Sequence, residues 1–191
     1  TQKEKNLLSK EKPWGIILFK RNIKNLKQLK ELTKEIRYLM EDKFYPILID
    51  EEGGRVSRFS NIFNTSAFHQ NYFGKTYEKN KTLGINSYIE YLSFNCELLN
   101  EVGINMNTIP VLDILKNNSH NIIGNRSYSK KIKTINNLKK ICFKILNKYK
   151  IGCVSKHIPG HGSSLVDTHL KTSIIKYKKK YLFKNDFKTF K

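Results

Sequence analysis

The residues with the clearest capacity for chemistry lie in one short segment of the sequence. Residues 156–162 read Lys-His-Ile-Pro-Gly-His-Gly and residues 167–169 read Asp-Thr-His, so three histidines, a lysine and an aspartate fall close together. Proline and glycine bend the backbone, which lets polar side chains converge. The apolar residues 151–154 predict a short buried strand, and α/β enzymes place their chemistry in loops that follow strand ends. The segment therefore predicts a site in which histidine transfers protons near neutral pH.

The same histidines raise the alternative of a zinc site. His157 and His161 are four residues apart, and with His169 and Asp167 they offer nitrogen and oxygen ligands that zinc accepts. A spacing of four brings two side chains together on a helix, however, and Pro159 opposes a helix here. We therefore predict no metal and no cofactor, and we expect His161 to form hydrogen bonds within its own loop.

Strands and helices alternate along the chain, which is typical of a parallel α/β fold. Four apolar runs predict buried strands over residues 14–19, 45–49, 103–113 and 152–155. Apolar residues at helical spacing predict helices over residues 25–40, 83–102 and 132–149. We expect a long polar, aromatic loop after the second strand and a lysine-rich tail without a strand over residues 176–191.

Polar residues follow the predicted strands where they end. Asp50 and the run Glu-Glu-Gly-Gly-Arg at 51–55 follow the second strand, Asp113 ends the third, and Lys156 with His157 follows the fourth. An open sheet would align such residues along one crevice, and a closed barrel would place them in a ring at one mouth. The Gly-Gly pair is not a phosphate-binding loop, because the spacing G-x-x-x-x-G-K-S/T of such loops is absent and carboxylates lie beside the pair.

Composition indicates one folded domain. The chain has 191 residues, 39% hydrophobic and 12% aromatic, which excludes a disordered protein. No apolar run is long enough to span a bilayer, and we find no signal peptide, so we expect no membrane association. We interpret Cys96, Cys142 and Cys153 as small buried apolar residues in a reducing cytoplasm, since they form no metal or redox motif.

The formal charge of +20 raises the alternative of a nucleic-acid-binding module. The excess is nearly all lysine, is spread along the whole chain and accompanies many Asn and Ile residues, as in a protein from a compositionally biased genome. No recognition helix, zinc finger or aromatic-basic platform accompanies it. The pattern favours solvated lysines on helix faces, and we expect no nucleic-acid partner.

Four segments carry a resemblance to a known family. They are Pro-Trp-Gly-Ile-Ile-Leu-Phe-Lys-Arg-Asn-Ile from residue 13, Ile-Leu-Ile-Asp-Glu-Glu-Gly-Gly-Arg-Val-Ser-Arg-Phe from residue 47, Ile-Ile-Gly-Asn-Arg-Ser-Tyr from residue 122, and the histidine segment at 156–169. In order and spacing they resemble the bacterial β-N-acetylhexosaminidases of glycoside hydrolase family 3. The resemblance implies an α/β fold, a parallel (β/α)8 TIM barrel, with residues 1–191 as the N-terminal part of a single barrel domain, roughly its first half.

The resemblance also implies an activity and a set of site residues. It implies removal of terminal non-reducing β-linked N-acetylglucosamine from peptidoglycan-derived muropeptides or oligosaccharides, with retention of configuration, during cytoplasmic cell-wall recycling. By position, it implies five sugar-binding residues: Asp50, Arg58, Arg126, Lys156 and His157. It further implies that His169 is the general acid/base and that Asp167 orients it. Chemistry agrees, because an aspartate can fix the tautomer of a neighbouring histidine and stabilise its charged form.

The main departure from the family is a missing nucleophile. The family's aspartate nucleophile lies on a later strand in a motif with adjacent aspartates, and this sequence has no Asp-Asp pair. Asp186, the only aspartate after Asp167, lies in the lysine-rich tail. We therefore expect residues 1–191 alone to be inactive and to self-associate through an exposed sheet edge and an uncovered apolar face. The remaining alternative is a non-catalytic, sugar-binding relic of a truncated gene.

Three further positions near the site stay open at the level of sequence. Arg55 either contacts the sugar or forms a salt bridge at the sheet end. Asp113 either caps an element or braces the barrel rim. Glu51 stands where the family often has Gln, a change that removes no group the chemistry needs.

Overall fold

A computed structural model describes residues 1–191 except 117–120, 159, 165, 167–171 and 176. Its centre is a parallel sheet whose four strands are β1 (Ile16–Leu18), β2 (Ile47–Ile49), β3 (Met106–Asn107) and β4 (Gly152–Cys153). Each strand pairs with the next along the chain, for example Ile16 with Ile47. The prediction of four parallel strands in this order is confirmed, but each strand is shorter than its predicted range, and β3 ends at Asn107 and not near Asp113.

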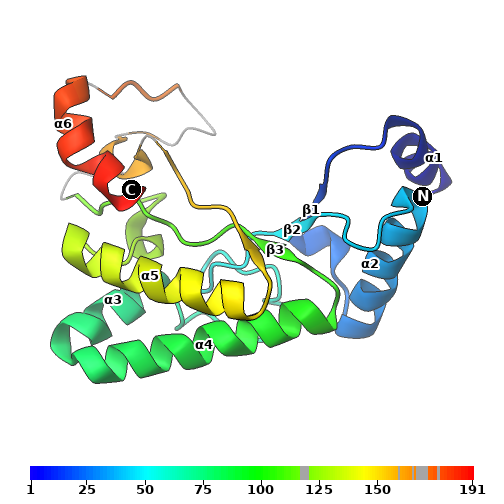
Figure 1. Cartoon of the computed structure of the whole chain (residues 1–191), viewed down its shortest axis with the longest axis horizontal. Coiled ribbons are helices and arrows are strands. Elements are labelled where there is room, and N and C mark those ends of the chain that lie inside the picture. The colour runs from blue at the N-terminus through cyan, green and yellow to red at the C-terminus, as the bar shows by residue number, and fades with distance from the viewer. Residues whose placement is uncertain (117–120, 159, 165, 167–171, 176) are drawn as a thin grey trace.

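Helices connect the strands. They are α2 (Leu26–Met40) between β1 and β2, α3 (Gln70–Lys79) and α4 (Lys81–Glu101) between β2 and β3, and α5 (Ile132–Lys148) between β3 and β4. In Figure 1, α3, α4 and α5 lie together on one side of the strands, while α2 lies at the opposite end beside α1 (Gln2–Glu11). Near the C-terminus come α6 (Lys179–Lys184) and the 3-10 turn η4 (Asp186–Thr189). None of the helices in the described part of the chain combines the length and the apolar character needed to cross a bilayer.

The predicted helices form because each has one apolar face and a suitable start. In α2, the side chain of Asn25 accepts a hydrogen bond from the backbone N–H of Gln28 and so caps the first turn. Leu29 and Ile36 lie on the buried face of this helix. Burial of such a side chain stabilises the fold by roughly 1.5–3 kcal/mol. The predictions of helices over 25–40, 83–102 and 132–149 are confirmed to within two residues at each end.

One expected loop contains a helix. The polar, aromatic segment after β2 includes α3, which buries Phe73 and Gly74. The side chain of His69 caps this helix by accepting a hydrogen bond from the backbone N–H of Tyr72 at 3.0 Å. Histidine is not among the residues that favour this position, so the helix start was not visible in the sequence.

The edge strands carry exposed apolar side chains. Ile17 in β1 is 39% exposed, and Val154 next to β4 is 38% exposed. Cys153 is also exposed, so the prediction that all three cysteines are buried is wrong for this residue, whereas Cys96 and Cys142 are buried. The cause is that β4 is an edge of the described sheet. Parallel sheets are normally covered on both faces. The exposed side chains of Ile17 and Val154 therefore form apolar surface that could contact another chain, as the prediction of self-association requires.

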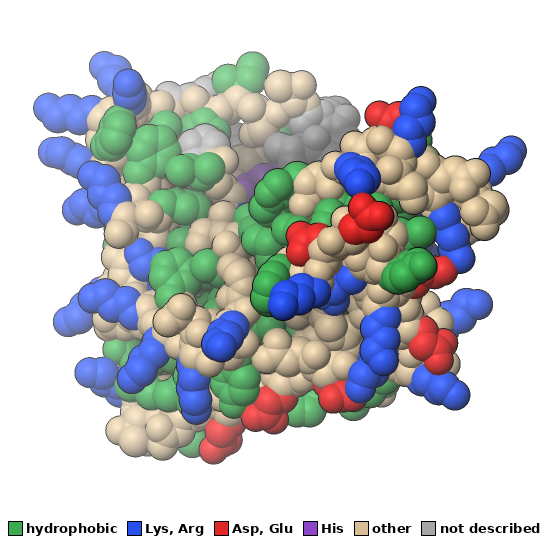
Figure 2. Space-filling view, turned by 45° about the vertical axis from the view of Figure 1, so that its right-hand side comes forward, with side chains coloured by type: hydrophobic (Ala, Val, Ile, Leu, Met, Phe, Trp, Pro, Cys, Tyr) green, Lys and Arg blue, Asp and Glu red, His purple; other side chains and the backbone are tan. Residues whose placement is uncertain are grey.

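Positively charged side chains are spread over the face of the molecule that Figure 2 shows. Figure 2 shows Lys and Arg side chains around both sides of the face in view, with apolar and acidic side chains between them. On this face they do not gather in one patch.

Asn107 extends the pairing of β2 and β3 beyond the strand ends. Its side-chain oxygen accepts a hydrogen bond from the backbone N–H of Glu51 at 3.0 Å, and its side-chain amide donates to the carbonyl of Glu51 at 2.9 Å. The Asn107 side chain is fully buried and takes the place of a strand backbone. The polar residues that follow β2 are thereby held in a fixed position.

The packing of α3 gives a test of this fold. A Cβ atom at Gly74 would lie 1.9 Å from the backbone oxygen of Tyr128. Replacing glycine by alanine inside a helix ordinarily stabilises a protein by about 1 kcal/mol. We predict instead that Gly74→Ala lowers the free energy of unfolding by about 1–3 kcal/mol, measured by urea denaturation. The exposed neighbour Lys75→Ala is the control, and equal stability of the two variants would contradict the close approach.

Candidate active site

The polar residues that follow β2, β3 and β4 meet in one cavity of about 450 Å³. Its lining consists of Asp50, Glu52, Val56, Arg58, Ile122, Arg126, Lys156, His157 and His161. All five residues predicted to bind a sugar are among them. Asp167 and His169 lie outside the described residues, so their predicted roles remain predictions.

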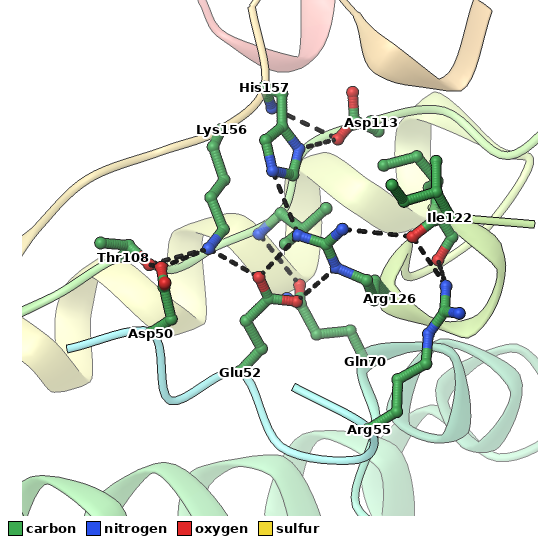
Figure 3. Close-up of polar contacts among 12 residues, drawn as sticks. Asp50, Glu52, Arg55, Gln70, Thr108, Asp113, Ile122, Arg126, Lys156 and His157 are labelled. Atoms are coloured by element: carbon green, nitrogen blue, oxygen red, sulfur yellow. Dashed lines mark hydrogen bonds and ion pairs between the residues drawn. The ribbon is translucent and has the colours of Figure 1, made fainter. Parts of the chain in front are cut away.

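Lys156 joins the ends of β2 and β4. Its Nζ lies 3.0 Å from Oδ1 of Asp50 and 2.6 Å from Oε1 of Glu52. It also donates a hydrogen bond to Oγ1 of Thr108 at 2.7 Å. Figure 3 shows the Lys156 side chain reaching between the two carboxylates. Asp50 forms a second ion pair with Arg58, whose Nη2 lies 2.8 Å from Oδ2 of Asp50.

Arg126 forms a second bridge across the cavity. Its Nε and Nη2 each donate to one carboxylate oxygen of Glu52 at 2.8 Å, a bidentate pairing. Its Nη2 also lies 3.1 Å from Nε2 of His157 (Figure 3). An arginine can only donate hydrogen bonds, so Nε2 of His157 is the acceptor and the ring proton resides on Nδ1.

Asp113 holds His157 and the turn that follows it. Its Oδ2 lies 2.6 Å from Nδ1 of His157 and accepts from the backbone N–H of the same residue at 3.3 Å. Its Oδ1 accepts from the backbone N–H groups of His161 at 2.6 Å and Gly162 at 3.3 Å. The side chain is fully buried, and all four donors come from one short segment. Asp113 therefore braces the loop after β4 and also caps the start of the 3-10 turn His161–Ser163, so both roles considered for it apply.

Pairing keeps the carboxyl groups of the cavity ionised. Burial by itself raises the pKa of Asp50, but the hydrogen bond from Thr108 and the charge of Lys156 outweigh it, and the pKa lies well below its ordinary value. Burial likewise opposes ionisation of Glu52, but the hydrogen bond from Arg126 and the charge of Lys156 lower its pKa. Both side chains are acceptors at neutral pH.

Charges in and beneath the cavity balance. The carboxylates are Asp50, Glu52 and Asp113, and the cations are Arg58, Arg126 and Lys156. The lining itself carries two carboxylates and three cations, and the buried Asp113 beneath it supplies the third carboxylate, so an anionic ligand would meet little net positive charge. A neutral ligand with hydroxyl groups suits this lining better, because each hydroxyl both donates and accepts a hydrogen bond.

Several residues near the cavity were not predicted or behave differently. Thr108 was missed, and Glu52 was placed at the strand end but not among the predicted sugar-binding residues. Their partners are distant in sequence, with Arg126 74 residues from Glu52 and Lys156 48 residues from Thr108. Within the described part of the chain, Arg55 forms no salt bridge, and it does not line the cavity. It donates to the backbone oxygens of Ile122 and Ile123 at 2.7 and 3.2 Å, and so holds the loop that lines one side of the cavity.

No group of three or more His, Cys, Asp or Glu side chains is arranged to hold a metal ion among the residues that the structure describes. Two members of the zinc alternative, Asp167 and His169, lie outside those residues. The absence of a metal therefore stays a prediction.

Sequence comparison identifies relatives of the whole chain. The profile described as "Glycosyl hydrolase family 3 N terminal domain" matches residues 1–191. A β-hexosaminidase of Neisseria meningitidis serogroup A is 35% identical over 171 residues, which are 89% of this chain and 46% of that protein. A β-hexosaminidase of Haemophilus influenzae is 30% identical over 194 residues, which are 99% of this chain and 52% of that protein. The chain thus spans about half the length of the curated relatives that it matches.

Solved structures show the same fold. Native NagZ from Neisseria gonorrhoeae matches with a TM-score of 0.90 and 33% identity, over 100% of this chain and 55% of that chain. NagZ from the same organism in complex with N-trifluoroacetyl-D-glucosamine matches with a TM-score of 0.89 and 32% identity, over 100% and 54%. The predicted fold class, a (β/α)8 barrel of which this chain forms roughly the first half, is confirmed.

The bracing role of Asp113 gives one prediction. In Asp113→Asn, either orientation of the amide places an NH2 group against two of the four donors, and at least one buried hydrogen bond is lost. We predict that the free energy of unfolding falls by about 1–3 kcal/mol, measured by chemical denaturation. Asp42→Asn is the matched control, because Asp42 is exposed and accepts from the backbone N–H of Phe44. A loss no larger than in the control would contradict the role of Asp113.

Glu51 gives a second prediction because it is buried beside the cavity without lining it. Its Oε2 accepts from Oγ of Ser57 at 3.0 Å and from the backbone N–H of Arg58 at 2.7 Å and of Phe59 at 3.3 Å. Its Oε1 has no hydrogen-bond partner among the described residues. Burial raises the pKa of Glu51 to about 7, although these hydrogen bonds and the charge of Arg58 oppose the rise.

A raised pKa means that the folded protein holds this proton more tightly than the unfolded chain. The contribution of Glu51 to stability is therefore complete below about pH 4.5 and is lost as the pH rises through about 7. We predict that Glu51→Gln raises the Tm little at pH 5 and most at pH 8. At pH 8 the free energy of unfolding of the variant should exceed that of the wild type by roughly 3 kcal/mol. Glu90→Gln, at an exposed position, controls for the loss of one negative charge. A Tm difference that does not widen with pH would contradict the protonated, buried carboxyl.

Proposed function

The chain belongs to glycoside hydrolase family 3, and from this premise we propose that the full-length protein removes terminal β-linked N-acetylglucosamine from peptidoglycan-derived muropeptides. The observation that carries the proposal is the cavity itself, which brings together all five residues that the family motif assigns to sugar binding. The similar NagZ of Neisseria gonorrhoeae has been crystallised with N-trifluoroacetyl-D-glucosamine, a derivative of the proposed sugar. A role in cell-wall recycling would place the protein in the cytoplasm.

In the proposed complex, the sugar meets groups that are already oriented. Asp50 accepts hydrogen bonds from hydroxyl groups, while Arg58, Arg126 and Lys156 donate to hydroxyl and carbonyl oxygens. Each of these side chains is held by a partner in the unliganded cavity, for example Lys156 by Asp50 and Glu52. Little ordering is therefore needed on binding, which favours affinity and correct placement of the glycosidic bond.

In the proposed reaction, His169 acts first as an acid and then as a base. It donates a proton to the glycosidic oxygen as an aspartate attacks the anomeric carbon, so the leaving group departs as a neutral alcohol. Neutral His169 then takes a proton from water, and that water cleaves the covalent glycosyl-enzyme bond with overall retention. Asp167 holds the histidine in the required tautomer and stabilises its charged form.

We propose that none of the aspartates in this chain is the nucleophile. Asp50 is paired with two cations, and Asp113 is saturated by four donors. Asp186 is buried in an ion pair with Lys116, and Asp42 is exposed beyond the end of α2. With Asp167 assigned to His169, the attacking carboxylate must come from elsewhere in the barrel. Residues 1–191 then form the N-terminal part of one barrel domain, inactive alone and prone to self-association at its open edges.

The test compares the natural full-length product of the gene with residues 1–191, using an aryl β-N-acetylglucosaminide and proton NMR of the first-formed anomer. We predict turnover with retention by the full-length product and none by residues 1–191. His169→Ala should lower kcat about 10²- to 10⁴-fold, and Lys156→Ala should mainly raise KM.

Two results would overturn parts of the proposal. Turnover by residues 1–191 that His169→Ala abolishes would contradict the missing nucleophile. Sugar binding without turnover by the full-length product would favour the non-catalytic relic.

A further inference from the structure

One carboxylate near the C-terminus is buried against the turn η3 (His161–Ser163), although sequence placed it in a lysine-rich tail. The side chain of Asp186 is 1% exposed. Its Oδ1 accepts from Oγ of Ser163 at 2.8 Å and from Nζ of Lys116 at 3.0 Å, and its Oδ2 lies 3.1 Å from the same Nζ. Nζ of Lys116 also donates to Oγ of Ser163. Three segments, the loop after β3, the turn η3 and η4, are thus joined by one ion pair and one hydroxyl.

The backbone of the turn packs directly on this carboxylate. A Cβ atom at Gly160 would lie 2.8 Å from Oδ1 and 3.1 Å from Cγ of Asp186. Gly160 also has a φ of 123°, which side chains other than glycine rarely adopt. The contact between the turn and Asp186 is therefore a close one.

Asp186 is itself anchored to the helical layer. Oγ1 of Thr189 donates to the backbone oxygen of Asp186 at 2.9 Å. The backbone oxygen of Thr189 in turn accepts from Nζ of the buried Lys139, on α5, at 3.0 Å. On the other side, Nζ of Lys116 lies 4.8 Å from the ring centre of Tyr177. The turn is therefore tied to a helix of the barrel wall.

The same turn is held from the cavity side by a different carboxylate. Asp113 accepts from the backbone N–H groups of His161 and Gly162, while Asp186 accepts from the side chain of Ser163. Asp167 follows Ser163 by four residues, and His169 by six. This turn, held by two carboxylates, therefore precedes the proposed acid/base pair by only a few residues.

We propose that Asp186, together with Lys116 and Ser163, is a positioning residue: it fixes the turn at residues 160–163, from which the chain continues to the proposed acid/base pair, Asp167 and His169. This inference rests on the proposed glycosidase function. Asp186 does not line the cavity, so its loss leaves the sugar contacts in place and acts on proton transfer. A shift of about 1 Å in a positioned catalytic group can lower a rate about 10²-fold.

The test uses the natural full-length product and aryl β-N-acetylglucosaminides with good and poor leaving groups. We expect Asp186→Asn to lower kcat about ten- to hundredfold while KM changes less than about twofold. The loss in kcat/KM, which reports the step in which the leaving group departs, should be greater for phenyl than for 2,4-dinitrophenyl, because the poorer leaving group depends more on the proton from the acid. Ser163→Ala keeps the ion pair and should show a smaller loss with the same dependence on leaving group.

Glu78→Gln is the matched control. Glu78 also accepts from a serine, a threonine and a lysine, namely Ser129 at 2.6 Å, Thr134 at 2.9 Å and Lys131 at 3.0 Å, but none of these is part of the turn. We expect this variant to keep its kcat even where its Tm falls. An equal fall in kcat in the control, a loss confined to KM, or a loss independent of the leaving group would overturn the positioning role.

Amide hydrogen exchange tests the turn without relying on activity. We expect faster exchange at residues 160–164 in Asp186→Asn than in the wild type, and no such change in Glu78→Gln. Unchanged exchange would overturn the inference. If the wild-type full-length product shows no turnover, the proposed function fails. Faster exchange in Asp186→Asn would even then support the role of Asp186 in holding the turn.

Discussion

The structure depends on the pairing of buried charges where β2, β3 and β4 end. Moving an ionised group from water into a protein costs several kcal/mol of free energy unless the group is paired with an opposite charge. Removing one member of a buried pair leaves the other as an uncompensated buried charge. Lys156 pairs with both Asp50 and Glu52, and Arg126 gives Glu52 a second positive partner. These contacts tie together loops that are far apart in sequence. The geometry of the cavity is therefore set by charge compensation as much as by the apolar core beneath it.

Charge compensation also decides which ligand the cavity suits. The chain carries a formal charge of +20, yet the cations of the cavity are each matched by a carboxylate. The excess lysine stays at the surface, as the face in Figure 2 shows, and does not make the cavity an anion site. What remains in the cavity is a set of fixed donors and acceptors, which a neutral sugar can use without displacing a counter-ion. The low pKa of Asp50 keeps that acceptor available over the physiological range.

Sequence predicted the parts of this structure that local patterns determine. Strands and amphipathic helices follow from apolar spacing, and the five residues predicted to bind a sugar do line one cavity. The helix α3 was missed because its cap is His69 and its buried face depends on contact with Tyr128. The pairing of Asp186 with Lys116 joins residues 70 positions apart, and no spacing rule connects them. What sequence could not give was the partner of each buried charge, because that depends on the three-dimensional arrangement of the strand ends.

The turn after His157 is held by two carboxylates, Asp113 and Asp186, which contact different atoms. Asp113 orients the imidazole of His157, a sugar-binding group in the proposed function, and also holds the backbone of His161 and Gly162. Among the described residues of the turn, Asp186 contacts Ser163 and packs against the backbone of Gly160. A change at Asp113 therefore disturbs both sugar contacts and the approach to the proposed acid/base pair, whereas a change at Asp186 leaves the cavity lining intact. In the proposed function, Asp113 thus bears on both sugar binding and proton transfer, because it contacts His157 and His161 of the cavity lining, whereas Asp186 bears on proton transfer alone, because it contacts the turn through Ser163.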